Sequence, residues 1–146
     1  MVGGQFSLQL TVPTVLSCFR AQKLLTMKLF DHENRRWSKN VVDKELELLC
    51  VSQFTLYGIF QGNKPDFHQA RHREEAQMLY EEFLDILKCG YKRNKIKDGL
   101  FGSHMQVSVQ NDGPVTFMIE STPTFEQRDS VSVRMNLPTF SVAVSR

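Results

Sequence analysis

Apolar and polar residues alternate along the first part of the chain, residues 1–19. Alternation with a period of two is typical of a β-strand that buries one face. The apolar positions of this run are Phe6, Leu8, Leu10 and Val12. Residues 21–30 (AQKLLTMKLF) then indicate the end of a helix that runs into a strand. Residues 31–34 read as a polar turn before a short element around Trp37.

The clearest strand pattern in the chain covers residues 45–57 (ELELLCVSQFTLY). In a regular strand every second side chain lies on the same face. One face would then carry Leu46, Leu48, Cys50, Ser52 and Phe54. The pattern predicts one strand along this segment.

The hydrophobic period changes to that of a helix from Arg71 to Lys88. An apolar stripe, spaced by three and four residues and set among glutamates, consists of Ala76, Leu79, Phe83 and Leu87. Residues 63–66 (NKPD) are typical of a turn and helix start, and Gly90 of a helix C-terminus. The sequence therefore predicts one main amphipathic helix.

Two further alternating runs, residues 105–109 and 115–119, flank the turn sequence QNDGP and predict a hairpin. After Pro123 the chain is rich in Ser and Thr, and we expect this tail to lie outside the core. With 146 residues and 41% hydrophobic side chains the chain can form one domain with a single core. The predicted fold class is α+β.

The charge of the chain is nearly balanced, with a net charge of +2. This excess is too small to require a nucleic-acid partner. Basic residues nevertheless gather in three places, which are Lys88, Lys92, Arg93, Lys95 and Lys97; Arg71 and Arg73; and Arg35, Arg36 and Lys39. A solvated surface is the usual explanation of such runs, and nucleic-acid binding is the alternative.

The spacing of the cysteines and the hydropathy of the chain indicate the cellular compartment in which the protein is expected. Cys18, Cys50 and Cys89 lack CxxC spacing, which argues against a disulfide framework and against a zinc site. The first residues lack the positive region of a signal peptide, and Pro13 interrupts their apolar part. No apolar stretch approaches the length of a membrane span. We expect a reducing, cytoplasmic compartment and no membrane partner.

Taken alone, the residues that could carry chemistry do not define a reaction. The chain has no Gly-rich phosphate loop and no HExxH helix. His68 and His72 stand four residues apart, but without a third ligand they indicate surface histidines rather than a metal site. The threonine of SQFTL has no neighbouring base in the sequence, so nucleophilic use cannot be inferred from it. We expect no metal and no cofactor.

Two short strings narrow the function. Residues 52–56 (SQFTL) and 111–116 (NDGPVT) resemble the paired signature motifs of D-aminoacyl-tRNA deacylases, SQFTL and NxGPVT, in the right order and with a helix between them. Residues 62–70 (GNKPDFHQA) and 96–116 (IKDGLFGSHMQVSVQNDGPVT) look like the animal members of that family almost throughout. The resemblance covers about residues 23–121.

The resemblance implies a compact, β-barrel-like homodimer with its active site at the subunit interface. Such an enzyme hydrolyses the ester bond of D-aminoacyl-tRNA, a chiral proofreading reaction that releases free D-amino acid and tRNA. The pocket of one subunit, which holds the ester and the terminal adenosine, would be lined by Ser52, Gln53, Phe54 and Thr55. Gly113 and Pro114, joined by a cis peptide bond, would reach in from the other subunit and exclude an L side chain.

The resemblance also implies a mechanism without a cofactor or metal. In the mechanism favoured for the family, the terminal 2′-hydroxyl of the tRNA takes part in hydrolysis. An older proposal makes the SQFTL threonine, here Thr55, a nucleophile. Positioning and oxyanion stabilisation could supply the acceleration, because an aminoacyl ester is already activated.

Both ends of the chain depart from the family's pattern. Residues 1–22 stand where family members carry a β-hairpin, a strand and a helix, so residues 23–122 correspond to an incomplete deacylase domain. Residues 123–146 form a divergent tail. Arg20 is not in the context of the family's N-terminal arginine, which holds the Gly-Pro motif. The alternatives to an active deacylase are an inactive truncated family member and a nucleic-acid-binding module that uses residues 88–97.

Overall fold

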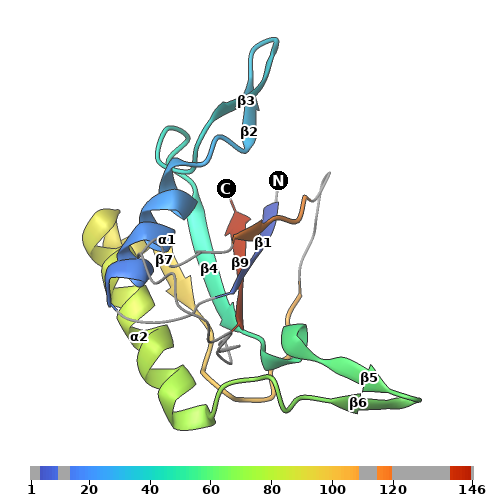
Figure 1. Cartoon of the computed structure of the whole chain (residues 1–146). Helices are drawn as coiled ribbons and strands as arrows, with labels where there is room; N and C mark the ends of the chain where they lie inside the picture. The colour runs from blue at the N-terminus through green and yellow to red at the C-terminus, as the bar shows by residue number, and fades with distance from the viewer. Residues whose placement is uncertain (1–3, 10–13, 109–114, 120–138, 146) are drawn as a thin grey trace, which may run out of the picture.

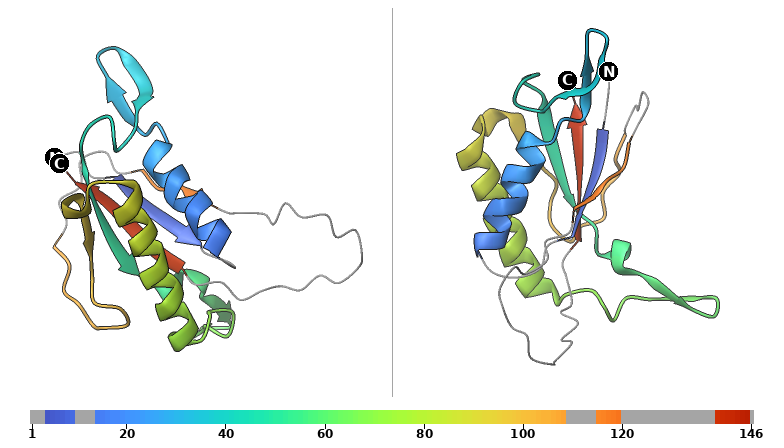
Figure 2. Two further views of the ribbon diagram at one scale, coloured as in Figure 1. Left: turned by 90° about the vertical axis from the view of Figure 1, so that its left-hand side faces the viewer. Right: turned by 45° about the horizontal axis from the view of Figure 1, so that its top comes forward.

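The computed structural model describes residues 4–9, 14–108, 115–119 and 139–145. A five-stranded sheet forms one layer, and helices α1 and α2 cover one of its faces (Figures 1 and 2). Two strand pairs project from this body, β2–β3 at one end and β5–β6 at the other (Figure 1). In chain order the elements are β1 (Gly4–Gln9), α1 (Thr14–Thr26), β2 (Phe30–His32), β3 (Arg35–Lys39), β4 (Glu47–Ser52), the 3-10 helix η1 (Phe54–Tyr57), β5 (Ile59–Gln61), β6 (Lys64–Asp66), α2 (Arg73–Gly90), the 3-10 helix η2 (Arg93–Lys95), β7 (Ile96–Asp98), β8 (Met118–Ile119) and β9 (Thr139–Ser145).

Strand β9 occupies the middle of the sheet, whose order is β7-β4-β9-β1-β8. It is antiparallel to both of its neighbours, so that Val142 pairs with Cys50 on β4 and with Phe6 on β1. The outer strands β7 and β8 each pair in parallel with the strand beside them. The expectation that the tail lies outside the core is therefore wrong for residues 139–145. Their alternating apolar residues could not reveal which strands they join.

The helices and the sheet enclose one hydrophobic core. The buried positions of α2 include Ala76, Phe83 and Leu87, as the sequence predicts, whereas Leu79 is half-buried. Tyr80 and Leu84 complete the buried face of α2. The other fully or nearly buried apolar residues include Ala21, Leu24 and Leu25 of α1, Leu48 and Cys50 of β4, and Ile96 of β7. A second helix thus shares the core with the predicted one.

The predicted strand 45–57 is confirmed only as far as Ser52. Leu46, Leu48 and Cys50 are buried as the alternation requires. Beyond β4 the chain turns into η1, and Phe54, which was expected on the buried face, is 59% exposed. The strand pattern continues in the sequence, but the backbone does not follow it.

The turn expected near residues 63–66 is confirmed, but the helix start expected there is wrong. These residues belong to the β5–β6 hairpin, where Pro65 pairs with Phe60 and Gly62 takes a φ of 62° in the turn. Glycine adopts that left-handed conformation without the steric cost of a Cβ. Helix α2 starts later, at Arg73, and its final residue is Gly90, one position before the cap at Tyr91.

The predicted hairpin 105–119 is not confirmed as such. Residues 103–108 lie outside any strand, and β8 pairs with β1 instead of with them. The turn at residues 109–114 lies outside the described residues. The N-terminal alternation expected over residues 1–19 is confirmed as a strand for Gly4–Gln9, whereas Leu10 and Val12 lie outside the described residues and the chain is helical from Thr14. The pairing of β2 with β3 confirms the turn before Trp37. The mixed helix and strand content agrees with the predicted class, while in the described part of the chain the sheet is open rather than a closed barrel.

Neither of the described helices has the length and apolar content that would let it cross a membrane.

The central place of β9 leads to a stability prediction. Val142→Pro removes a backbone N–H from a strand that pairs on both sides, and each buried backbone group left without a partner costs about 1–3 kcal/mol. We expect the melting temperature to fall by roughly 5–15 °C. Val142→Thr keeps the N–H and is the matched control. Equal thermal melts for the two variants would show that β9 contributes nothing to the sheet.

Candidate active site

The site begins where β4 leaves the core. The backbone carbonyl of Cys50 accepts hydrogen bonds from the Tyr80 hydroxyl at 2.8 Å and from the Gly99 N–H at 3.0 Å. Burial raises the pKa of Tyr80 above its usual value, so the phenol keeps the proton that it donates. Burial likewise raises the pKa of the Cys50 thiol to about 12, which keeps it inert at neutral pH. The last buried residue of β4 is thus held from α2 and from the loop after β7.

The chain turns outward at Ser52 and Gln53, beyond the buried part of β4. The Ser52 hydroxyl oxygen lies 3.5 Å from the Gly102 N–H, which donates to it. Gln53 caps the start of η1, and its side-chain amide donates to the Thr55 hydroxyl. The turn is closed by the Gly58 N–H, which donates to the Thr55 carbonyl at 3.0 Å. The structure therefore brings together the hydroxyls of Ser52 and Thr55 and the amide of Gln53 on one exposed turn.

The aromatic ring of Phe54 lies at the surface beside this turn. It meets Phe67 edge-to-face, with ring centroids 5.1 Å apart and an interplanar angle of 73°. Gly58 lies beneath Phe67, where a Cβ atom would stand 2.8 Å from the Phe67 ring. Sequence reasoning did not single out Gly58 or Phe67. The segment GNKPDFHQA, which contains Phe67, was the only signal that pointed to it.

The Gly113–Pro114 pair lies outside the described residues. The described residues nearest to it in sequence on the C-terminal side are Val115, which is half-buried, and Thr116, which is exposed. Phe117 follows them, and its ring meets that of Trp37 edge-to-face at 5.9 Å. The structure thus describes the SQFTL part of the predicted site, and the Gly-Pro part stays a prediction.

The chemistry of the turn is that of neutral hydrogen-bonding groups. Within the described residues, the hydrogen-bond partner of the Thr55 side chain is the amide of Gln53, which cannot accept a proton at neutral pH. The first intrahelical bond of η1 runs from the Leu56 N–H to the Gln53 carbonyl at 3.4 Å, so the N–H groups of Phe54 and Thr55 have no acceptor inside that helix. The turn can position and polarise a carbonyl, but it offers no base to activate Thr55.

Arg20 is a buried cation of α1 that interacts electrostatically with the end of η1. It is 1% exposed although it belongs to α1, and burial lowers the pKa of its guanidinium to about 10. Tyr57 of η1 is close enough to oppose that change electrostatically. The sequence could not predict this electrostatic interaction, because α1 and η1 are far apart along the chain.

Histidines near the site do not form a metal centre. His68 binds Asp66 through its backbone N–H at 2.9 Å and through its ring Nδ1 at 2.7 Å, and these bonds lower the pKa of Asp66. His72 precedes α2 as its N-cap. In the part of the chain that the structure describes, no three His, Cys, Asp or Glu side chains are arranged to hold a metal ion.

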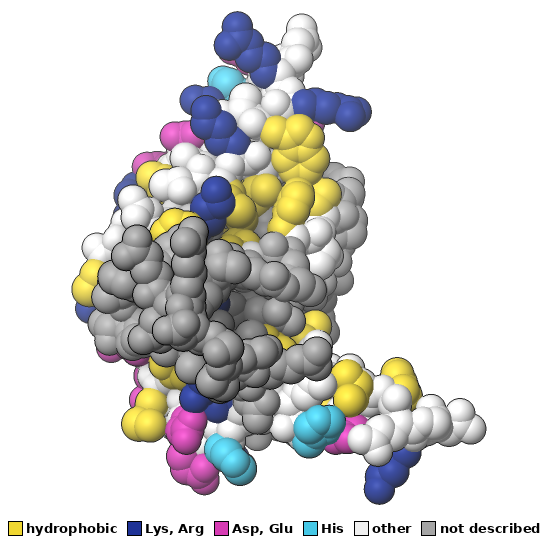
Figure 3. Space-filling view, viewed as in Figure 1, with side chains coloured by type: hydrophobic (Ala, Val, Ile, Leu, Met, Phe, Trp, Pro, Cys, Tyr) yellow, Lys and Arg dark blue, Asp and Glu magenta, His cyan; other side chains and the backbone are white. Residues whose placement is uncertain are grey.

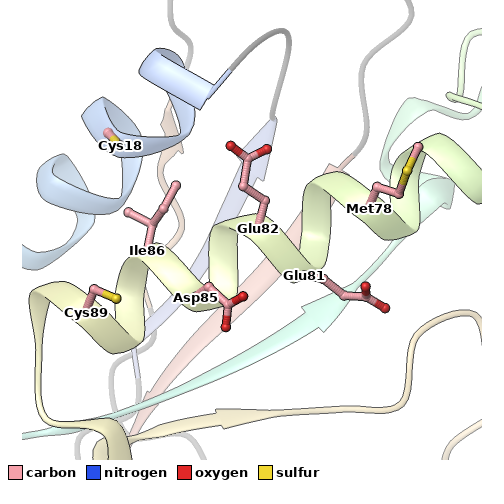
Figure 4. Close-up of a pocket in the computed structure, with 7 residues that line it drawn as sticks. All are labelled: Cys18, Met78, Glu81, Glu82, Asp85, Ile86 and Cys89. Atoms are coloured by element: carbon pink, nitrogen blue, oxygen red, sulfur yellow. The ribbon is translucent and has the colours of Figure 1, made fainter.

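A separate groove of about 600 Å³ lies between α1 and α2 (Figure 4). Its apolar floor includes Met78 and Ile86, and three carboxylates line it, those of Glu81, Glu82 and Asp85. Negative charge at this density repels a phosphate-bearing ligand. The groove also shares no residue with the SQFTL turn, so it is not the candidate active site.

Acidic partners neutralise most of the basic run 88–97. Lys88 lies 3.5 Å from Asp98, Lys92 lies 2.5 Å from Glu45, and Lys95 lies 3.8 Å from Glu47. These ion pairs agree with the interpretation of the run as a solvated surface. They weaken the alternative of a nucleic-acid-binding module that works through residues 88–97.

Comparisons with known proteins agree with the motifs. Residues 17–120 match the family described as D-Tyr-tRNA(Tyr) deacylase. The chain is 54% identical over 112 residues to the D-aminoacyl-tRNA deacylase of Drosophila melanogaster. This match covers 77% of the chain and 69% of the Drosophila protein. It is 52% identical over 101 residues to D-aminoacyl-tRNA deacylase 1 of Homo sapiens. That match covers 68% of the chain and 48% of the human protein. The chain thus spans about half the length of the vertebrate relatives.

A solved structure extends the likeness to the fold. The protein described as c-Myc DNA Unwinding Element Binding Protein superposes with a TM-score of 0.72 at 45% sequence identity, and the match covers 82% of this chain and 83% of that one. Sequence, fold and the exposed SQFTL turn agree with one another. The chain belongs to the D-Tyr-tRNA(Tyr) deacylase family.

Proposed function

We propose that this protein hydrolyses the ester bond of D-aminoacyl-tRNA and releases free D-amino acid and tRNA. The observation that carries the proposal is the exposed turn after β4, which presents the family motif SQFTL on a rigid support. The relatives named above are deacylases of this substrate class. A rigid strand end is suited to positioning a reactive ester, which is itself a large part of catalysis.

The proposed roles follow from the groups that the turn exposes. The Ser52 and Thr55 hydroxyls, the Gln53 amide and the N–H groups of η1 hold the ester carbonyl and the terminal adenosine, and Phe54 offers its exposed face to the substrate. Donors aimed at the carbonyl oxygen stabilise the negative charge that develops there. The terminal 2′-hydroxyl of the tRNA assists the attack of a water molecule on the ester carbonyl, and the bond to the 3′-oxygen breaks, because the SQFTL turn offers no side-chain base. No cofactor or metal is needed in this scheme.

Chiral selection is assigned to Gly113 and Pro114. Mirror-image substrates offer the same groups for attraction, so steric exclusion is the effective way to separate them. A cis Gly113–Pro114 peptide would direct its carbonyls at the space that an L side chain needs. Glycine at the first position would let the chain approach the substrate where a Cβ would obstruct it.

The pocket is proposed to be completed by a second copy of the chain. Apolar side chains are exposed around the candidate turn, namely Phe54, Leu56, Ile59 and Phe60, and Phe60 is 77% exposed. Exposed apolar groups that gather in one place are typical of protein–protein interfaces. A homodimer that closes into the barrel-like family fold would cover them. We place this enzyme in the cytoplasm, where its tRNA substrate is used.

A deacylation assay with matched D- and L-aminoacyl-tRNA tests the proposal. We expect the protein to release the D-amino acid and to spare the L counterpart. Size exclusion run alongside distinguishes a dimer from a monomer. A folded protein that hydrolyses neither ester would instead be an inactive member of the family.

Gly113→Ala is expected to reduce stereochemical selection and to leave the fold intact. We expect the ratio of D to L hydrolysis to fall by at least about tenfold, which corresponds to about 1.4 kcal/mol of discrimination. Ser103→Ala, a change of similar size at an exposed position, is the control. A Gly113→Ala variant with full activity and full selectivity would remove this residue from the selection mechanism.

Thr55→Val is expected to lower kcat by less than about tenfold, because only a positioning hydroxyl is lost. Removal of a covalent nucleophile would instead cost on the order of 10⁴-fold or more. A D-aminoacyl-tRNA that ends in 2′-deoxyadenosine should resist the unmodified enzyme. Thr55→Ser keeps the hydroxyl and is the control. A trapped covalent aminoacyl-Thr55 ester would restore the nucleophile model.

A further inference from the structure

The β2–β3 arm, residues 30–39, carries three cations within five residues, namely Arg35, Arg36 and Lys39. Arg35 and Arg36 are exposed and Lys39 is half-buried. Within the described residues none of these three side chains forms an ion pair or a side-chain hydrogen bond, whereas three of the five basic residues of the run 88–97 are paired with carboxylates. Cations that are not already neutralised are the ones that can replace counterions on a nucleic-acid backbone.

The two acidic residues of the arm, Asp31 and Glu33, make local contacts within it. The Asp31 carboxylate accepts a hydrogen bond from the backbone N–H of Trp37 at 2.9 Å. The backbone carbonyl of Asp31 accepts a hydrogen bond from the Lys44 ammonium at 3.0 Å. Glu33 stands 3.8 Å from His32. These contacts shape the hairpin, and among the described residues neither carboxylate forms an ion pair with Arg35, Arg36 or Lys39.

The positive arm stands apart from the negative helix surface. Dark-blue Lys and Arg side chains gather at the top of Figure 3, where Figure 1 shows β2 and β3, and a hydrophobic patch adjoins them. The acidic residues Glu81, Glu82 and Asp85 lie on α2, in the groove that faces α1. A polyanion is therefore drawn to the arm and repelled from that groove.

Trp37 links the arm to the segment that follows the Gly-Pro motif. The pairing of β2 with β3 is irregular, and Trp37 takes a φ of 52°, a conformation that is strained for a bulky side chain. An irregularity of this kind redirects a side chain, and here the indole meets the edge of Phe117 at 5.9 Å and 86°. Phe117 is the residue after NDGPVT. The indole also stays 45% exposed beside the cations.

We propose that the β2–β3 arm binds the phosphate backbone of the tRNA, through Arg35, Arg36 and Lys39, while its aminoacylated end occupies the SQFTL turn. This inference rests on the proposed function and assigns to it a second contact surface. Trp37 joins the arm to the segment after the Gly-Pro pair through its ring contact with Phe117. Contacts to phosphate position a nucleic acid and add affinity without reading sequence.

Neutralisation of the arm tests the proposal. The variant Arg35→Gln/Arg36→Gln/Lys39→Gln is compared with Lys92→Gln/Arg93→Gln/Lys95→Gln, which removes three cations from the largely paired run. We expect the arm variant to raise KM for D-aminoacyl-tRNA at least about tenfold and to change kcat much less. Its slope of log KM against log salt concentration should fall by roughly 2–3. The control variant should stay close to the unmodified enzyme, and thermal melts confirm that both are folded.

A short substrate distinguishes a failure of the arm proposal from a failure of the proposed function. With 3′-D-aminoacyl-adenosine, which lacks the RNA backbone, the loss caused by the arm variant should be at least about tenfold smaller than with tRNA. Equal losses on both substrates, or an unchanged KM for tRNA, would overturn the assignment of the arm. If the unmodified protein hydrolyses neither substrate, the proposed function fails, and uncharged tRNA then tests the arm by direct binding.

Trp37 supplies that binding measurement, because it is the only tryptophan of the chain. Titration with uncharged tRNA should change its fluorescence, and the midpoint should move to at least about tenfold higher RNA concentration in the arm variant. The control variant should keep the original midpoint. Binding of tRNA that leaves the Trp37 signal unchanged, or equal midpoints for all three proteins, would place the RNA elsewhere.

Discussion

The carbonyl of Cys50 accepts two hydrogen bonds inside the core, and the geometry of the candidate site depends on them. Tyr80 supplies one from α2, and Gly99 supplies the other from the loop after β7. Strand β9 adds a ladder on the other side of the same strand. A backbone group that is held from several directions cannot shift without leaving buried polar atoms unpaired, which costs about 1–3 kcal/mol for each group. The next residues therefore leave the core at a fixed place and in a fixed direction.

This support explains how one short motif can serve both stability and chemistry. Up to Cys50 the segment buries apolar side chains, and from Gln53 onwards it exposes polar groups and the ring of Phe54. A site built at the end of a strand inherits the rigidity of the sheet, and its exposed groups remain free to meet a ligand.

The basic runs of this protein differ in how many of their side chains form ion pairs with carboxylates. The longest basic run in the sequence is largely neutralised by Asp98, Glu45 and Glu47, while the shorter run of the β2–β3 arm is not paired. A net charge of +2 conceals this difference. Electrostatic attraction depends on the local field, so the distribution of ion pairs matters more than the net charge of the chain.

The sequence by itself determined which side chains share a face of a regular element and which family the motifs resemble. Leu46, Leu48 and Cys50 are buried as their alternation requires, and Phe83 and Leu87 as their helical spacing requires. Periodicity reports such local facts because it measures only the repeat of one element. The SQFTL and NDGPVT strings were recognisable without any structure.

Only the tertiary structure decided where the elements end and what they meet. Strand β4 stops at Ser52 although its pattern continues, β9 enters the middle of the sheet, and Trp37 reaches Phe117. The bond that holds Cys50 joins residues 30 positions apart, and the pair between Lys92 and Glu45 joins residues 47 positions apart. Contacts of this kind depend on how separate elements pack, and no local pattern encodes the partner, because many sequences of equal periodicity could occupy the same place.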